Sequence, residues 1–180
     1  REVSATLDLD RVLDSVINVL SYDLGFTFVV LSLIDWPNNT LRSARVSGLA
    51  HKMAGLERPL DRLQNDIVLD VARSRKVEIV DGWDDRFDRQ VYEREGHAEL
   101  VRAFVPVTVR NNALGVLEAG YRRTERAKIT EEEVRLLSGL ASQVAVAVEN
   151  ARLFAESQAA LKQVQASEQE LIRFKLGLEQ

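Results

Sequence analysis

The 180-residue sequence contains no cysteine, and this absence excludes several classes of chemistry at once. Without thiols there is no disulfide framework, no cysteine nucleophile and no cysteine-ligated metal site. A cofactor attached through a thioether is excluded as well. Histidine is also scarce, since only His51 and His97 are present.

Signatures of catalysis are missing too. The sequence has no G-x-S-x-G, no H-E-x-x-H and no glycine-rich phosphate loop, and its nine glycines never fall at G-x-G spacing. Neighbouring carboxylates such as Asp84 and Asp85 are common in loops and define no catalytic geometry. We therefore expect a non-catalytic chain with no catalytic residues and no metal site.

Long apolar runs and basic clusters are equally absent. The most apolar segment, residues 26–34, is far shorter than the roughly 20 residues of a membrane span. No signal peptide is visible, and the net charge of −4 without a basic, aromatic cluster argues against nucleic-acid binding. We expect a cytoplasmic chain with no membrane segment. Because it starts at Arg1 and ends within a helical pattern, we interpret it as a fragment of a longer protein.

Hydrophobic residues make up 46% of the chain, which is enough for a core. Apolar residues at helical spacing predict helices over residues 9–20 and 66–75, while residues 48–64 are ambiguous between loop and short helix. Runs rich in β-branched and aromatic residues predict strands over residues 26–34, 41–47, 77–80, 100–109 and 113–121.

Turn signals join these strands into hairpins. One turn is predicted at Trp36 to Asn39 and another at Asn111 and Asn112, because asparagine tolerates positive φ. Pro106 favours an edge or a bulge in its strand. Hairpin connections imply an antiparallel sheet, here of five to six strands with helices grouped against it, which is an α+β fold.

A long helix is predicted from Thr130 onward. Thr130 and Glu133 have the spacing of a capping box, and no proline follows. The alternating Val144 to Val148 segment therefore belongs to this helix and not to a strand. Beyond Phe154, positions 154, 157, 161, 164, 168, 171, 175 and 178 form a heptad seam, whose predicted dimer contacts are Leu161, Val164, Leu171 and Leu178.

This seam divides the chain. We expect a compact domain over residues 1–155 and a coiled-coil helix over residues 156–180, on the order of 70 Å for the whole helix at ~1.5 Å per residue. The sequence thus predicts a parallel homodimer through the first and last helices. The alternative is that the seam packs on the chain's own first helix.

The most informative polar residues outside the helices are Glu118 and Arg102, which lie in neighbouring predicted strands. Strand alternation places Glu118 on the same face as Leu114 and Val116. We expect them to form a buried ion pair at the floor of a ligand pocket. The polar segment Trp83 to Glu99 is a long loop of the kind that often carries function. The predicted pocket walls are Trp83, Phe87, Tyr92 and Tyr121. Ordinary packing of these aromatics against the sheet is the alternative.

Two segments together resemble a GAF domain. They are FVPVTVRNNALGVLEAGY, starting at Phe104, and ITEEEVRLLSGLASQVAVAVENARLF, starting at Ile129. The resemblance spans about residues 7–156. It implies a central antiparallel sheet with the terminal helices on one side and a ligand pocket beneath loops on the other. It also implies a place in a multidomain bacterial signalling protein, such as a sensor histidine kinase of a two-component system, a cyclase or a regulator.

Departures from the family reduce the number of ligand classes expected. Members that bind a bilin mostly attach it through a cysteine, so a covalently bound bilin is not expected here. Members that bind cyclic nucleotides often carry N-K…F-x-x-x-D-E, which residues 121–134 lack. Some members bind haem through a histidine before the V-P strand, and His97 stands nine residues before Pro106. Because His97 follows Gly96 in the polar segment, a solvent-exposed loop histidine is the preferred interpretation. The leading expectation is a sensory and dimerisation module that binds an unknown small molecule and relays its state to neighbouring domains. A structural dimerisation domain without ligand and a haem sensor using His97 are the alternatives.

Overall fold

The computed structural model describes the backbone of residues 2–178 and the side chains of residues 6–178. Six strands form one antiparallel sheet in the order β3-β2-β1-β6-β5-β4. The strands are β1 (Phe28–Asp35), β2 (Thr40–Gly48), β3 (Glu57–Pro59), β4 (Glu78–Asp81), β5 (Leu100–Val109) and β6 (Asn112–Arg122). The predicted α+β class and antiparallel sheet are confirmed.

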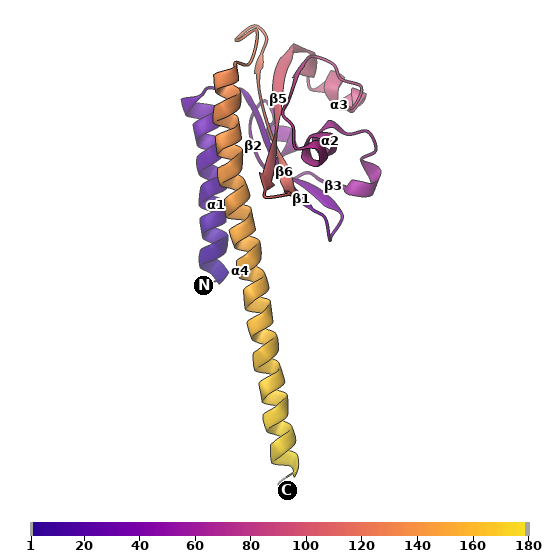
Figure 1. Ribbon diagram of the computed structural model, residues 1–180. Helices are drawn as coiled ribbons and strands as arrows, with labels where there is room; N and C mark the ends of the chain where they lie inside the picture. The colour runs from indigo at the N-terminus through magenta and orange to yellow at the C-terminus, as the bar shows by residue number, and fades with distance from the viewer. Residues whose placement is uncertain (1, 179–180) are drawn as a thin grey trace.

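Helices cover both faces of this sheet. Figure 1 shows the two terminal helices side by side on one face and the two short helices on the other. The helices are α1 (Glu2–Asn18), which continues as a π-helical turn (Val19–Asp23), α2 (Ile67–Ser74), α3 (Arg89–Arg94) and α4 (Glu131–Leu178). Segment 82–99, which contains α3, is therefore separated from the terminal helices by the thickness of the sheet.

The alternation of side chains along the central strands builds two cores. On the face of the terminal helices, Leu117 and Ala119 of β6 pack with Leu137 and Val144 of α4. On the opposite face, a second apolar cluster joins α2 to the sheet. Because strands β1 and β6 are buried on both faces, they read as continuous apolar runs.

A bulge corrects the predicted face of one β6 residue. Gly115 pairs with Val107 and Ala113 pairs with Thr108, so Leu114 is an extra residue in the ladder. Leu114 consequently joins the core beneath the terminal helices, whereas Val116 faces α2. The sequence-based prediction that Leu114 shares the face of Glu118 was wrong. The extra residue of a bulge reverses the alternation of side chains between the two faces of the strand.

Other local differences have simple causes. The ambiguous segment 48–64 supplies the short edge strand β3, and the left-handed residue of the second hairpin is Arg110 rather than an asparagine. Pro106 lies on β5 beyond the end of β4, which pairs only as far as Phe104. Its missing N–H is tolerated there because one side of the strand is free.

Helix α4 begins with the predicted capping box. The Glu133 amide donates to Thr130 Oγ1 at 3.1 Å, and the Thr130 amide donates to Glu133 Oε1 at 3.1 Å. The alternating Val144 to Val148 segment is helical, as expected. The 48 residues of α4 extend well beyond the sheet (Figure 1), and nearly all side chains past Phe154 are exposed. None of the helices among residues 2–178 is long and apolar enough to cross a membrane.

Candidate functional site

The candidate site lies between the sheet and segment 82–99, on the face opposite α1 and α4. At its centre, Arg102 Nη1 donates to Glu118 Oε1 at 3.0 Å, and both side chains are more than nine-tenths buried. Arg102 comes from β5 and Glu118 from β6, so the sheet itself fixes the pair. The expected buried ion pair is therefore present.

Gly120 makes room for this arginine. It pairs with Arg102 across the β5–β6 ladder, and a Cβ at position 120 would lie 2.8 Å from Arg102 Cγ and 2.5 Å from the Val101 carbonyl oxygen. Only glycine lets the aliphatic part of Arg102 lie this close to β6.

The pair is only partly satisfied. Burial raises the pKa of Glu118, although the charge of Arg102 and its hydrogen bond oppose that rise. On the other side, Arg102 Nε and Nη2 are buried and make no hydrogen bond in the described structure. An unmade hydrogen bond of a buried donor costs about 1–3 kcal/mol, and more for a charged group. The site therefore offers two strong donors without acceptors.

Aromatic rings surround the guanidinium. Phe87 of segment 82–99 lies over it, with its ring centroid 4.2 Å from Arg102 Cζ, and Phe28 and Phe104 each lie 5.7 Å away. Trp83 and Tyr92 extend this cluster, with centroids 4.9 Å apart and edge-on packing. The predicted walls Trp83, Phe87 and Tyr92 thus come together around the ion pair.

His97 belongs to the same cluster and is buried, so the prediction of a solvent-exposed loop histidine was wrong. Its ring packs perpendicular to Phe28 at 5.3 Å and to Tyr92 at 6.4 Å. Burial, and secondarily the charge of Arg102, lowers the pKa of His97 from 6.5 to about 4, so the imidazole is neutral at pH 7. A porphyrin bound to this histidine would have to enter a cluster in which Phe28 and Tyr92 already pack against the ring.

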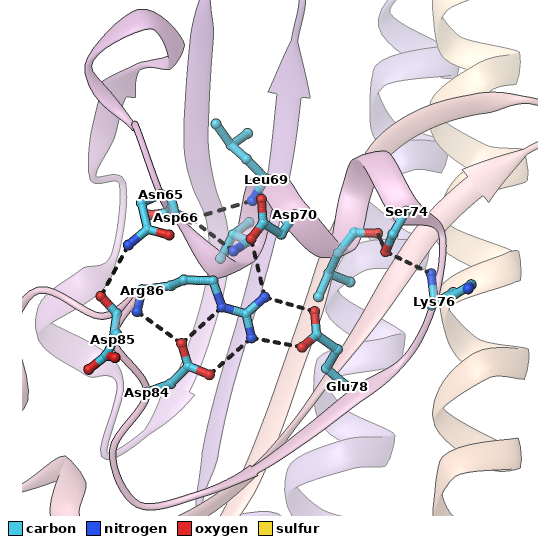
Figure 2. A network of polar contacts seen from close by, with 12 residues as sticks. Asn65, Asp66, Leu69, Asp70, Ser74, Lys76, Glu78, Asp84, Asp85 and Arg86 are labelled. Carbon is cyan, nitrogen blue, oxygen red and sulfur yellow. Dashed lines mark hydrogen bonds and ion pairs between the residues drawn. The ribbon is translucent and has the colours of Figure 1, made fainter.

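Arg86 ties the first half of segment 82–99 to helix α2 and strand β4. Figure 2 shows its guanidinium surrounded by the carboxylates of Asp70, Glu78 and Asp84. Nη2 donates to Glu78 Oε1 at 2.7 Å and Nε donates to Asp84 Oδ1 at 2.9 Å. These bonds raise the pKa of Arg86 and lower that of Asp84. One residue thus ties the segment to both α2 and β4.

Two further residues, Arg123 and Lys52, hold the second half of the segment. Arg123 bonds the carboxylate of Asp81 and donates to the Ala98 carbonyl at 3.1 Å, while Lys52 pairs with Glu95 at 3.5 Å. These contacts are at the surface, where single ion pairs contribute little. The segment is therefore held mainly by polar contacts at its edges and by aromatic rings beneath it.

Tyr121 does not join the site, which corrects the predicted pocket. It lies an odd number of residues from Glu118, so it faces the terminal helices, where it stacks on Phe26 at 4.4 Å. Its hydroxyl oxygen lies 3.0 Å from the Leu24 carbonyl oxygen and 2.7 Å from Glu133 Oε2, so the two acceptors share its single donor proton. Burial and the carboxylate of Glu133 raise the pKa of Tyr121. Tyr121 therefore joins β6 to the first turn of α4.

Three residues of the site were missed in the sequence. Phe104 stands two residues after Arg102, so strand alternation could have placed it on the same face. Phe28 comes from β1, and only the strand order brings it near Arg102. Nothing in the sequence identifies Arg86 as an anchor, because segment 82–99 contains many charged residues and Arg86 does not stand out among them.

A second candidate surface is a groove of about 690 Å³ between α1 and α4. Its lining includes Leu9 and Val12 of α1 and Ala147 and Phe154 of α4. Further along α4, apolar side chains remain exposed, including all four predicted dimer contacts: Leu161, Val164, Leu171 and Leu178. Ile172 and Phe174 are exposed beside them, so the apolar surface is broader than the heptad seam.

The groups at the buried site are suited to binding a ligand through hydrogen bonds and apolar contacts. Among the described residues, no group of three histidine or acidic side chains lies close enough to hold a metal ion. The two free donors of Arg102 suit hydrogen-bond acceptors, and the rings around them suit apolar groups.

Several solved bacterial proteins share this fold. The chain is similar to the GAF domain/HD domain protein from Geobacter sulfurreducens, with a TM-score of 0.71 and 17% identity over 85% of this chain and 99% of that one. The blue-light absorbing form of the Thermosynechococcus elongatus PixJ GAF domain gives a TM-score of 0.65 and 14% identity over 89% and 96% of the two chains.

A domain of a putative two-component sensor histidine kinase from Sinorhizobium meliloti 1021 gives a TM-score of 0.61 and 17% identity, over 83% of this chain and 97% of that one. At such identities the likeness shows the fold. No curated protein matches the chain. Residues 6–149 match the family described as GAF domain, which is most of the sequence, and the chain therefore belongs to the GAF domain family.

Proposed function

We propose that this chain is the sensory and dimerisation module of a larger signalling protein. GAF domains are sensory or regulatory modules in such proteins and are generally non-catalytic. In this proposal, residues 1–155 bind a small molecule beneath segment 82–99. Residues 156–180 are a signalling helix that carries the bound state to a neighbouring domain of the same chain.

The observation that carries this proposal is the Arg102–Glu118 pair. An ion pair buried in an aromatic cluster contributes little net stability, because desolvation offsets the attraction. Two donors left unpaired make it less favourable still. A ligand that supplies acceptors to Arg102 would relieve this cost. Segment 82–99 covers the pair and would have to move aside for the ligand to enter.

A relay to α4 has a direct physical route along β6. This strand carries Glu118 on the site face and Tyr121 on the opposite face, three residues away. Tyr121 in turn bonds Glu133 in the first turn of α4. A shift of β6 on ligand binding would therefore change the position or angle of α4. Such coupling requires two arrangements of α4 that the ligand favours unequally.

Dimerisation is supported by the continuity of two surfaces. Counting the heptad seam of residues 154–178 backwards, its positions fall on Gln143, Ala147 and Asn150, all of which line the α1–α4 groove. A second copy packed in parallel along the seam would therefore meet this groove as well. This geometry favours the partner chain over the chain's own α1 as the occupant of the seam.

Native mass spectrometry of gently purified protein tests the sensory function. A bound small molecule that is lost in the Phe87→Ala variant, and kept in a matched Phe174→Ala variant on the exposed end of α4, supports the proposal. Phe87 covers the site, whereas Phe174 is 65% exposed and far along the signalling helix. If the protein never carries or acquires a ligand, a structural dimerisation domain is the better account. The aromatic side chains that cover the buried ion pair would then be ordinary packing.

The haem alternative has its own test. His97 lies in the site, but Phe28 and Tyr92 already pack against its ring. A visible absorption spectrum recorded with and without added haem distinguishes a haem sensor from a sensor of another small molecule. A sharp band that His97→Ala abolishes would favour haem, and an unchanged protein spectrum would leave the small-molecule sensor as the better account.

A further inference from the structure

The two unpaired donors of Arg102 have a fixed geometry relative to one another. Nη1 is used by Glu118, and Nε and Nη2 are the two buried nitrogens without a partner. In a planar guanidinium, Nε–H and the adjacent Nη2–H lie along the same edge and point in nearly the same direction. The free donors therefore form one complete two-point edge, which matches the two oxygens of a carboxylate.

The surroundings of this edge limit the rest of the ligand. The guanidinium face is covered by Phe87 at 4.2 Å, and Phe28 and Phe104 stand nearby. Apolar walls suit a ligand whose body is short and apolar. They also strengthen a charged hydrogen bond by excluding water.

Charge limits the ligand to at most one negative charge. Arg102 and Glu118 already neutralise one another and His97 is neutral at pH 7, so any anion adds net charge to a buried site. A phosphate dianion adds two charges, whereas a carboxylate adds one, and burial, which raises the pKa of Glu118, favours uptake of a proton there to offset it. A cationic ligand would find no free acceptor on Arg102, whose unpaired atoms are all donors.

We propose that Arg102 holds the carboxylate of a small organic acid or amino acid through a two-point hydrogen bond from Nε and Nη2, beneath segment 82–99. This inference rests on the proposed sensory function and adds the class of ligand to it. Arg102 is then the residue that recognises the ligand, and Glu118 is a positioning residue that fixes the guanidinium through Nη1.

The first experiment identifies what the native protein carries. Small molecules are released from gently purified protein by denaturation and identified by mass spectrometry, in wild type, Arg102→Lys and Arg173→Lys. Lysine keeps the charge but has no two-point edge, and Arg173 is an exposed arginine far along α4 whose replacement serves as the control. We expect a carboxylate-bearing molecule from wild type and Arg173→Lys, and at least ten-fold less from Arg102→Lys.

The second experiment does not depend on any variant that fails to fold. The Nε–H signal of Arg102 is followed by ¹H–¹⁵N NMR in the full wild-type chain while sodium butyrate, or the neutral isostere butyramide, is added. We expect butyrate to shift this signal in a saturable way and butyramide to leave it in place.

The outcomes separate this inference from the proposed function. A released molecule that lacks a carboxylate, or one retained by a folded Arg102→Lys, overturns the carboxylate assignment and leaves the sensory function standing. No released molecule together with an unchanged Arg102 signal overturns both. A shift with butyramide as large as with butyrate also overturns the assignment, because the charge of the ligand would then be irrelevant.

Discussion

At the scale of single residues, the effect of replacing Arg102 on the free energy of unfolding depends on whether Glu118 is present. Replacing Arg102 alone leaves a carboxylate buried without a partner, while replacing both removes two buried charges and two unpaired donors. We expect Arg102→Met to lower the free energy of unfolding by about 3–5 kcal/mol. We expect the double variant Arg102→Met/Glu118→Leu to recover most of that loss. Urea unfolding of the four proteins in the cycle measures both.

The matched control is the exposed pair Arg89 and Glu93 on α3, whose side chains are about two-thirds exposed. The same cycle there should give a coupling of about 0.5 kcal/mol or less. If the buried cycle gave a coupling as small as the exposed one, the two charges would not depend on one another and the site as described would be wrong.

His97 makes a pH-dependent contribution. Its pKa is lowered to about 4 in the folded protein, so the unfolded chain binds a proton at higher pH than the native state does. The free energy of unfolding should therefore fall as the pH is lowered from about 6.5 to about 4. Arg102 and Glu95 are the charged groups that act on this ring. Glu118, whose pKa is raised, contributes with the opposite sign.

Histidine ¹³C NMR of wild type follows this titration directly, with His51→Gln used to assign the two signals. Urea unfolding of His97→Gln should show less loss of stability over the same pH window, since Glu118 remains in both proteins. A His97 signal that titrates near pH 6.5 would contradict the buried, neutral ring.

At the scale of elements, the start of α4 depends on its capping box. Thr130 and Glu133 satisfy each other's amides, and Glu133 also accepts from Tyr121. We expect Thr130→Ala to lower the free energy of unfolding by about 1 kcal/mol. Thr130→Ser, which keeps the hydroxyl, should cost only a few tenths. Equal losses in the two variants would show that the hydroxyl does not cap the helix.

Segment 82–99 depends on Arg86 in the same way. Arg86→Lys keeps one charge but cannot bond Asp70, Glu78 and Asp84 together, so we expect a loss of about 1–2 kcal/mol. Hydrogen exchange should become faster within the segment while the central strands stay protected. Arg94→Lys is the control, because the bond of Arg94 to its chain neighbour Glu95 lies within the segment, and no bond to another described part of the chain is seen. Unchanged exchange in Arg86→Lys would remove Arg86 as the anchor.

These elements also show what the sequence could and could not predict. The capping box and the helical period placed α4, and apolar runs placed the central strands, because both signals are local. The face of Leu114 depended on a bulge, which local patterns do not report, whereas the odd spacing of Tyr121 from Glu118 could have placed Tyr121 on the opposite face. Phe28 joined the site only through the strand order, which is a property of the whole sheet.

At the scale of the whole molecule, the exposed end of α4 needs a partner. Val164 and Leu171 lie on the heptad seam and are more than half exposed, whereas Ala166 lies on the opposite side of the helix in the heptad register. In the proposed parallel dimer, the seam is buried between two copies. A glutamate placed there would meet its own copy across the interface, and both like-charge repulsion and lost apolar contact would oppose association.

We therefore expect Val164→Glu/Leu171→Glu to raise the dimer dissociation constant at least ten-fold, and Ala166→Glu to leave it within about two-fold, measured by sedimentation equilibrium of the full chain. A second protein ending at Phe154 separates the seam from the α1–α4 groove. Weakened but detectable association would show that the groove contributes. Undiminished association would show that the seam plays no part, and the exposed apolar residues of α4 would then have to meet a different domain.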